Sequence, residues 1–407
     1  MFKKNLRLQS LTENNATKPP HLELQKLASM KITEIIRRIS FRINNRVVHL
    51  PHANKIRKGG VLFSYITYPF LTQNGCNLAT HTNYWEACKM AMEFQKRGYD
   101  VDVIDSENTI FVPEKKYDYI LDIHANLERL APLLPQHCKK ILFLTTSHWS
   151  FNNLAEEARL RDVEKRRGVH FPSERMLLPT KSEHFADYIL YLGNSFTFST
   201  YNLLTTKAYN IPISTTFTFL NPNKNWTTAR RGFVWIGGAG VIHKGVDLLV
   251  ESFAKEPSLT LQLCGKYEST LFAKVYETEL AKPNIIQHGT VDLGSVQFEN
   301  IRLTNTFVIS TSCAEGQSGA VIVGMHAGLI PIVSKECGIN TEDFGFTLPD
   351  CSIESITKII KECAEMPASE LAIRAEKSWA YAQKHHTREL FSTTFATFVD
   401  TLEAERI

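Results

Sequence analysis

Several features that would place this chain in a special class are missing from it. No apolar run approaches the length of a membrane span, and residues 1–15 lack the apolar core of a secretory signal. The eight cysteines are dispersed and include no CxxC pair, which favours reduced thiols over disulfides or a zinc site. No group of histidines and carboxylates has metal-ligand spacing. We therefore predict a cytoplasmic protein with no bound metal.

What remains is an ordinary globular composition, at a length that suits two domains. Of the 407 residues, 43% are hydrophobic and 22% are charged. Short apolar runs alternate with helical segments, which predicts α/β domains built on parallel sheets. In the first half we expect strands at 61–66, 101–104, 119–123, 141–145, 188–192 and 213–219. In the second half we expect them at 233–236, 259–264, 285–287, 306–309 and 330–333.

This pattern divides the chain into a basic arm at 1–58, a first domain at 59–222, a second domain at 223–385 and a final helix at 386–407. The arm holds 13 of the 46 lysines and arginines but three of the 42 acidic residues. Residues 24–48 have the pattern of a basic amphipathic helix, which would lie on an anionic membrane surface. A solvated arm, or a helix packed on its own domain, fits the same residues. Nucleic-acid binding is not favoured, because the positive charge is confined to this arm and lacks an aromatic platform.

The most informative segment is 312–334, SCAEGQSGAVIVGMHAGLIPIVS. The acidic Glu315 opens a turn that leads into an apolar helical segment, and a buried strand follows. Free N–H groups at a helix N-terminus favour phosphate, while a carboxylate beside them accepts hydrogen bonds from hydroxyls. The residues of this turn predicted to contact a ligand are Gly316, Gln317, Ser318 and Gly319.

A second segment, 233–253, supports the same chemistry. A short strand runs into a glycine-rich turn and then into an amphipathic helix. Glycines let the backbone approach a ligand closely, and Lys244 is a mobile charge suited to a phosphate. A structural turn is the alternative, but the order of the two segments fits a doubly wound sheet. The predicted binding residues here are Gly237, Gly238, His243 and Lys244.

Together the two segments resemble glycosyltransferase family 4 (glycosyl transferases group 1), a retaining family. Gln287-His288-Gly289 looks like the strand-end HG that precedes the family's donor loop. The resemblance implies the GT-B architecture, in which two Rossmann-like domains with parallel sheets face each other across a cleft. It also implies a C-terminal helix that crosses back to the first domain.

The chain departs from the family at two places. Val323 stands where the family usually has a second glutamate, so the expected ribose contact is missing. Gly238 and Ala239 stand where the family often has an arginine, so half of the expected diphosphate clamp is missing. Either the nucleotide is held differently or the activity is weakened.

The resemblance implies transfer of a hexosyl group from a nucleotide-diphosphate sugar to a hydroxyl of a saccharide or lipid-linked saccharide, as in cell-surface polysaccharide or glycan synthesis. Lys244 and the turn's N–H groups would hold the phosphates, and Glu315 would hold sugar hydroxyls. Neither a metal nor another cofactor is expected. Two alternatives stay open: another GT-B enzyme such as a nucleotide-sugar epimerase, and a non-catalytic protein that binds sugar nucleotides or saccharides.

Two residues in the first half could face the same ligand. His148 follows the strand predicted at 141–145 and looks like the histidine that family members present to the donor sugar. The alternative is a histidine that caps its loop. Gly75 could let a loop approach the diphosphate, or it could be a plain turn glycine.

Two further motifs have weaker implications. In the charged segment 150–168, Asn153 and Glu157 share a helical face and could contact the acceptor, but a solvated helix is the favoured alternative. Asp100-Val101-Asp102 is a literal DxD motif. Strand alternation predicts both aspartates on one exposed face of an edge strand, in a structural role.

Overall fold

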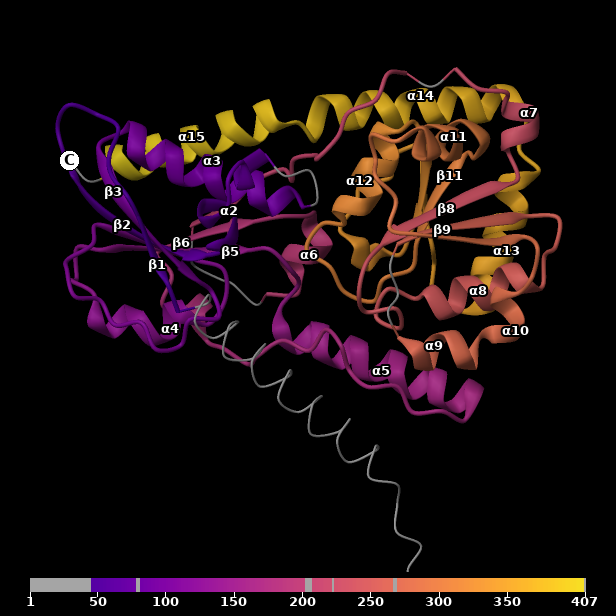
Figure 1. Ribbon diagram of the computed structural model, residues 1–407, viewed down its shortest axis with the longest axis horizontal. Coiled ribbons are helices and arrows are strands. Elements are labelled where there is room, and N and C mark those ends of the chain that lie inside the picture. Colours follow the sequence, from indigo (N-terminus) through magenta and orange to yellow (C-terminus); the bar gives the residue numbers. More distant parts are fainter. Residues whose placement is uncertain (1–44, 78–80, 202–206, 222, 266–268, 406–407) are drawn as a thin grey trace, which may run out of the picture.

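The computed structural model describes residues 45–77, 81–201, 207–221, 223–265 and 269–405. Two α/β domains, each built on a central sheet, stand side by side (Figure 1). Most of the predicted amphipathic segment 24–48 lies outside the described residues, but Val47 and Val48 begin a strand of the first sheet. No helix in the described ranges is long and apolar enough to span a membrane.

Within the described residues, the first sheet has seven strands in the order β1-β3-β2-β4-β5-β6-β7. Strands β2 to β7 pair in parallel, and β1 pairs antiparallel with β3 at the edge. The strands are β1 (Val47–Leu50), β2 (Gly59–Tyr65), β3 (Tyr99–Asp105), β4 (Tyr119–Asp122), β5 (Lys139–Leu144), β6 (Tyr188–Tyr191) and β7 (Lys207–Asn210).

The second sheet is wholly parallel, with the order β10-β9-β8-β11-β12-β13. Its strands are β8 (Gly232–Gly237), β9 (Thr260–Gly265), β10 (Ile285–Gly289), β11 (Phe307–Ser310), β12 (Ile330–Val333) and β13 (Phe346–Thr347). The chain order reverses between β8 and β11. In open α/β sheets, ligands bind at the carboxyl ends of the strands where this reversal occurs. The two glycine-rich turns predicted to bind a ligand, in segments 233–253 and 312–334, come directly after these two strands.

Ten of the eleven predicted strands are present, each within two residues of its expected bounds. The strand predicted at 213–219 was wrong, because this segment crosses between the domains without pairing to either sheet. Its backbone N–H groups donate to side chains and not to a neighbouring strand. Glu86 accepts the Ser214 N–H at 2.8 Å, and Gln317 accepts the Ile213 N–H at 3.1 Å. Strand β7 closes the first sheet instead.

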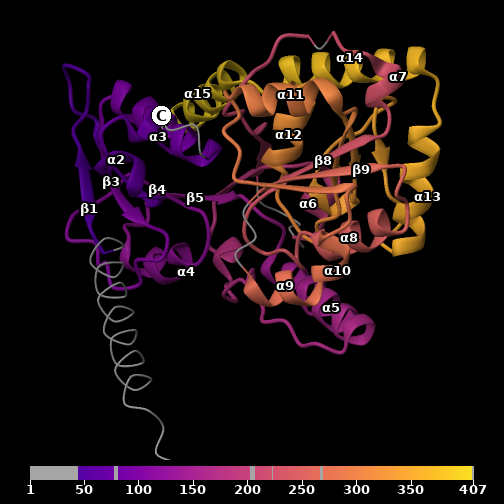
Figure 2. The same ribbon diagram turned by 45° about the vertical axis from the view of Figure 1, so that its right-hand side comes forward.

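Helices surround both sheets (Figures 1 and 2). In the first half of the chain they are α2 (Tyr68–Leu71), α3 (Thr82–Lys96), α4 (Asn126–Leu130), α5 (Trp149–Arg167) and α6 (Ser195–Ser199). In the second half they are α7 (Trp226–Ala229), α8 (Val246–Ala254), α9 (Thr270–Val275), α10 (Glu277–Leu280), α11 (Val296–Thr304), α12 (Gly319–His326), α13 (Ile353–Ala364), α14 (Ala368–His385) and α15 (Arg388–Ala404).

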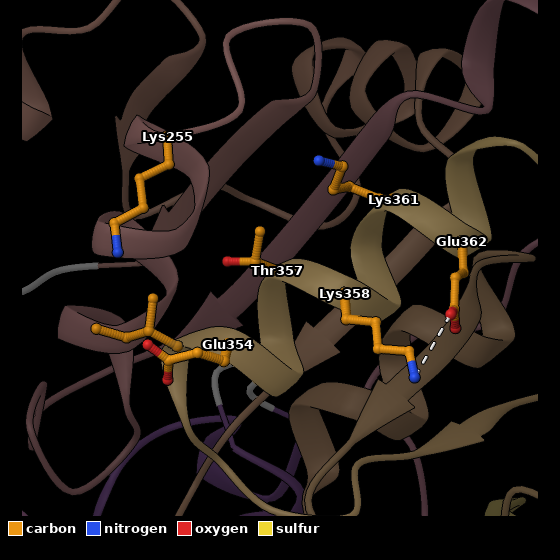
Figure 3. A pocket seen from close by; sticks show the side chains of 7 residues that line it. Lys255, Glu354, Thr357, Lys358, Lys361 and Glu362 are labelled. Carbon is orange, nitrogen blue, oxygen red and sulfur yellow. Dashed lines mark ion pairs between the residues drawn. The ribbon is translucent and has the colours of Figure 1, made fainter.

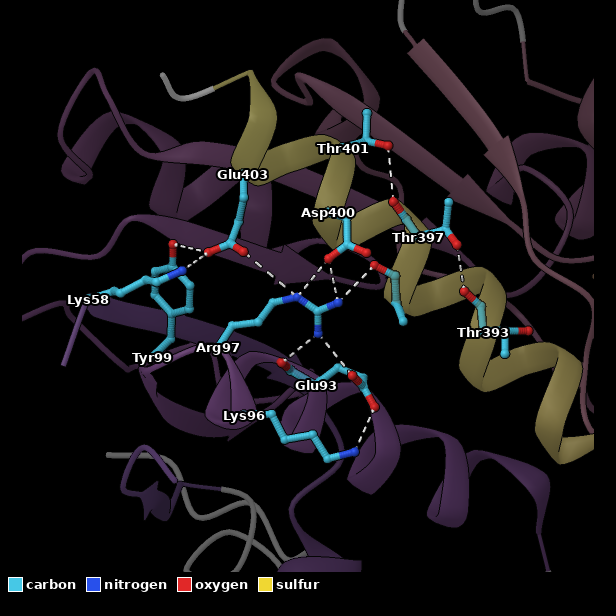
Figure 4. Close-up of polar contacts among 11 residues, drawn as sticks. Lys58, Glu93, Lys96, Arg97, Tyr99, Thr393, Thr397, Asp400, Thr401 and Glu403 are labelled. Atoms are coloured by element: carbon cyan, nitrogen blue, oxygen red, sulfur yellow. Dashed lines mark hydrogen bonds and ion pairs between the residues drawn. The ribbon is translucent and has the colours of Figure 1, made fainter. Parts of the chain in front are cut away.

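Helix α15 crosses back onto the first domain, as predicted. Its apolar face buries Phe391 and Phe395, and the ring of Phe395 lies 5.9 Å from that of Phe94 in α3. Polar contacts flank this core (Figure 4). Arg97, which follows α3, donates to Asp400 at 2.6 Å and to the carbonyl of Ala396 at 3.1 Å. The helix therefore ties the chain end to the first domain through both apolar and charged contacts.

Helix α5 makes the reverse crossing, from the first half of the chain to the second domain. Both views show it beneath α8 and α10 (Figures 1 and 2). Val163 belongs to the core of the second domain, and Arg166 donates to the buried Asp247 of α8 at 2.5 Å. Arg167 pairs with Glu279 of α10 at 2.7 Å. The sequence of this helix is typical of a solvated helix, but ion pairs hold one of its faces against the second domain.

One cysteine prediction was wrong. Cys76 and Cys88 form a disulfide, whereas the other six cysteines are free. The two are 12 residues apart in sequence, but the turn before α3 folds back onto that helix and brings their Cα atoms to 5.7 Å. Spacing alone therefore did not reveal the pair, which bears against a strictly reducing location.

The predicted exposure of the DxD motif was also wrong. Strand β1 pairs with β3, so β3 is not the edge strand of the sheet. Asp102 is only 2% exposed. Asp102 accepts a hydrogen bond from Tyr117 and pairs with Lys115, both at 2.6 Å. Across the described ranges, no group of three or more His, Cys, Asp or Glu side chains is arranged to hold a metal.

Candidate functional site

The candidate site lies where β8 and β11 end side by side. The loop after β8 enters α8 through Gly245, whose φ of 68° lies in the left-handed region that favours glycine. The loop after β11 leads to α12. Hydrogen bonds join the two loops: Cys313 N–H donates to the His243 carbonyl at 2.9 Å, and the Thr311 hydroxyl donates to that of Gly245 at 3.0 Å. Sequence-distant turns are thus fixed as one unit.

The side chains of Lys244 and Glu315 meet at this junction. The Lys244 Nζ lies 2.6 Å from Glu315 Oε1, and the Ser312 hydroxyl donates to the same oxygen at 3.0 Å. Burial opposes ionisation of Glu315, but the positive charges of Lys244 and Arg175 outweigh it and lower the pKa of Glu315 to about 2. Both side chains keep some exposure, 18% for Lys244 and 15% for Glu315. A charged pair is therefore within reach of a ligand.

Helix α12 points its N-terminus toward the same region. The Ser318 N–H donates to the Cys337 carbonyl at 2.9 Å, so that predicted contact is already taken. Within the described part of the chain, the next two N–H groups, of Gly319 and Ala320, meet no acceptor. Such unpaired donors at a helix start favour an anion.

Three of the predicted turn residues contact the first domain. A side chain at Gly316 would lie 2.2 Å from the Thr145 carbonyl oxygen, and the Gly316 carbonyl accepts from Thr197 at 2.8 Å. Gln317 accepts the N–H of Ile213 in the interdomain segment, and Gly319 lies beside the same residue. This turn therefore joins the domains as well as facing the site.

The two glycines that end the β8 segment differ in role. A side chain at Gly237 would lie 2.3 Å from the indole ring of Trp235, so packing requires this glycine. A side chain at Gly238 would meet nothing within 4 Å. Gly238 is therefore the position where a ligand could approach the backbone.

His243 supports the site without facing it. The ring is 2% exposed; its Nε2 lies 2.7 Å from the Ala314 carbonyl and its Nδ1 lies 3.4 Å from the Glu156 carboxylate. Its Nε2 contacts the Ala314 carbonyl, whereas its Nδ1 makes no hydrogen bond within the described residues and only lies near the Glu156 carboxylate. The residue thus joins the turn before Glu315 to the loop after β8, with helix α5 alongside.

His148 occupies the N-cap of α5. Its Nδ1 accepts the Ser150 N–H at 3.3 Å, and its Nε2 lies 3.5 Å from Glu183. The hollow beside it measures about 20 Å³, room for roughly one water molecule. These contacts favour the capping alternative. Gly75 likewise packs in a turn, where a side chain would lie 2.4 Å from the Pro69 carbonyl oxygen.

The proposed acceptor residues lie on α5. Asn153 pairs with the backbone of Leu177, accepting its N–H at 2.8 Å and donating to its carbonyl at 2.9 Å. Glu157 is exposed and lies 3.5 Å from Arg161. His288, from the QHG motif, contacts the side chain of Gln262 at 2.7 Å. Asn153 and His288 therefore make contacts within the protein.

Glu156, which precedes Glu157 on α5, was not predicted from the sequence to belong to the site. Glu156 is 1% exposed and faces His243, one position from Glu157. The helix buries Asn152, Glu156 and Val163, at intervals of four and seven residues. Val163 is the one buried apolar residue of the helix, so counting back from it would have found this face.

A separate hollow of about 530 Å³ lies beside α8 and α13 (Figure 3). It is open, and no predicted site residue lines it. The lining residues come from the end of α8 and from α13: Lys255, Ile353, Glu354, Thr357, Lys358, Lys361 and Glu362.

No protein-family model matches the chain, and no curated protein matches it in sequence. Solved structures do match its fold. HepE from Anabaena, crystallised with UDP and glucose, is 13% identical, with a TM-score of 0.54 over 85% of this chain and 100% of that one. WaaG, a glycosyltransferase involved in lipopolysaccharide biosynthesis, is 12% identical, with a TM-score of 0.50 over 83% and 98%. These likenesses confirm the predicted GT-B fold with two Rossmann-like domains.

Proposed function

We propose that this protein is a glycosyltransferase that moves a hexosyl group from a nucleotide-diphosphate sugar to a hydroxyl of a saccharide or lipid-linked saccharide, with retention at the anomeric carbon. The observation that carries the proposal is the Lys244–Glu315 pair at the point where the second sheet reverses its strand order. The structural neighbour HepE, crystallised with UDP and glucose, supports the same class of donor.

Each group in the site has a part in this reaction. Breaking the anomeric bond produces an oxocarbenium-like sugar and a charged diphosphate, so the site must stabilise charge and exclude water. Lys244 and the N–H groups of Gly319 and Ala320 would hold the diphosphate. Glu315 would accept hydrogen bonds from sugar hydroxyls. The leaving phosphate would take the acceptor's proton, so a separate base is not required.

Lys244 and Glu315 contact each other directly. Donor binding would separate them, because the phosphate would attract the lysine while the sugar hydroxyls turned to the carboxylate. The acceptor would lie against the first domain, and Asn153 and Glu157 remain candidates for its contacts. The basic segment 1–58 would bring the enzyme to an anionic membrane surface.

The test is a transfer assay with UDP-, GDP- and ADP-sugars and a panel of glycan and lipid-linked acceptors. We expect sugar transfer from one donor class, and loss of transfer in Lys244→Ala and Glu315→Ala without unfolding. Conversion of a donor in the absence of acceptor would indicate an epimerase instead. Wild-type turnover in both variants would refute the assigned roles.

A non-catalytic binding protein is the second candidate. Val323 is 5% exposed and belongs to the apolar core, so it offers no contact to a ribose. Calorimetry that shows donor binding, together with no turnover on any acceptor, would favour this reading.

A further inference from the structure

A loop from the first half of the chain lies against the glycine-rich turn of the second domain. The buried carboxylate of Glu156 accepts the N–H of Glu174 at 2.7 Å and that of Arg175 at 2.9 Å. Asn152 donates to the Arg175 carbonyl at 2.8 Å. Since Glu156 also faces His243, the loop and the turn share one buried anchor.

The side chain of Arg175 runs along this turn. A Cβ atom placed on Gly240 would lie 2.7 Å from Arg175 Cγ and 3.0 Å from its Cδ, and the φ of Gly240 is 88°. Only glycine therefore suits this close approach. The Arg175 side chain is exposed, and within the described residues its guanidinium meets no carboxylate or other acceptor. Its charge nevertheless acts on Glu315, whose pKa it helps to lower.

The neighbouring Glu174 contacts the same turn. Its Oε2 accepts the Gly240 N–H at 2.6 Å. A backbone N–H of the glycine-rich turn therefore already donates to a carboxylate oxygen, at a position where it could also donate to a phosphate oxygen. The loop thus places one unused cation and one anion beside the Lys244–Glu315 pair.

We propose that Arg175 is the second cation of the diphosphate site and that Glu174 holds the Gly240 amide until a ligand phosphate replaces it. The inference rests on the proposed function, and it names a nucleoside diphosphate as the ligand. The planar guanidinium carries five donors in a fork that fits phosphate oxygens, whereas Lys244 acts as a point charge. The first-half loop and the second domain would then bind one diphosphate together.

Calorimetric titration of the full chain with UDP, GDP and ADP, and with the three nucleosides, tests this. The variants are Arg175→Met, which keeps the apolar stem, Arg175→Lys, and Glu174→Gln. Lys165→Ala serves as the charge-matched control, because Lys165 is exposed near the end of α5. Unchanged thermal midpoints in the variants would show that the fold is intact.

We expect Arg175→Met to weaken binding of the preferred diphosphate by about 10-fold or more, with partial recovery in Arg175→Lys. Nucleoside binding should not change. Glu174→Gln should tighten diphosphate binding several-fold, since it removes a competing negative charge. Lys165→Ala should bind as the wild type does.

The outcomes separate the inference from the proposal beneath it. Diphosphate binding that is equal in wild type and Arg175→Met overturns the inference and leaves the proposed function standing. An equal loss in Lys165→Ala also overturns it, because net charge would then be the cause. A wild-type protein that binds none of the three diphosphates overturns both.

Discussion

The carboxyl ends of β5 and of the β8–β11 pair were both predicted to face a ligand, but they differ in the structure. After β5, His148 caps a helix and faces Glu183, so its ring nitrogens contact the protein. After β8 and β11, Lys244 and Glu315 pair with each other, and their side chains are 18% and 15% exposed, close to the 17% of His148. Both are strand ends, where ligands bind in this fold class. The difference teaches that the partners of a strand-end side chain, and not its position or its exposure, distinguish the two sites.

Removing either member of the charged pair should have the largest effect. We expect Lys244→Ala and Glu315→Ala each to lower the transfer rate by roughly 100-fold or more, because each removes charge stabilisation in a water-poor site. Steady-state kinetics with the preferred donor measure this. A His148→Ala variant that loses as much would erase the contrast between the two strand ends.

The adjacent residues Glu156 and Glu157 sharpen the contrast within one helix. Glu156→Ala should lower the free energy of unfolding by about 2–3 kcal/mol, because the N–H groups of Glu174 and Arg175 lose the buried, charged acceptor that they share. Glu157→Ala, at an exposed position, should change it by less than about 0.5 kcal/mol. Denaturant unfolding of both variants gives the comparison. Equal effects would contradict the burial of Glu156.

The junction between the domains contains a buried carboxyl whose pKa is raised. Burial raises the pKa of Glu86 from its ordinary 4.5 to about 6, although Ser214 donates two hydrogen bonds to it. The folded state therefore holds this proton more tightly, and the stability from Glu86 is lost as pH rises from about 4.5 past 6. Because a shift of one pKa unit is about 1.4 kcal/mol, Glu86→Gln should remove a pH-dependent loss of about 2 kcal/mol. Unfolding of both proteins at pH 5 and pH 8 tests the sign, and identical pH profiles would contradict it.

His148 gives the smallest expected effect. As an N-cap, its replacement by alanine should lower the free energy of unfolding by about 1 kcal/mol and leave the Michaelis constant for the donor nearly unchanged. Thermal unfolding and donor titration check the two halves of this statement. A large loss of turnover at unchanged stability would restore the catalytic role that its sequence position suggests.

Much of the fold was predictable, because local pattern and chain order determine it. Apolar runs located ten strands, and the Gly-rich turns located the two loops of the switch point. The predictions failed where contacts between residues far apart in the sequence determine the local structure. Residues 213–219 are apolar enough for a strand, but Glu86 and Gln317 bind their backbone donors. The Cys76–Cys88 disulfide depends on a turn that spacing does not reveal.

The site was predictable only in part. Lys244 and Glu315 were found because each lies within a glycine-rich motif. Arg175 lies in no motif, and it reaches Gly240 because α5 crosses to the other domain through pairs such as Arg166–Asp247. Nothing in the local sequence indicates this crossing, since the helix is charged on most of its surface.

The most direct test of the central claim is calorimetric titration of the wild type and of Lys244→Ala with UDP, GDP and ADP. We predict that one of these diphosphates binds the wild type, and that it binds the folded variant at least about tenfold more weakly. Equal affinity in the two proteins, or no binding of any diphosphate to the wild type, would contradict it.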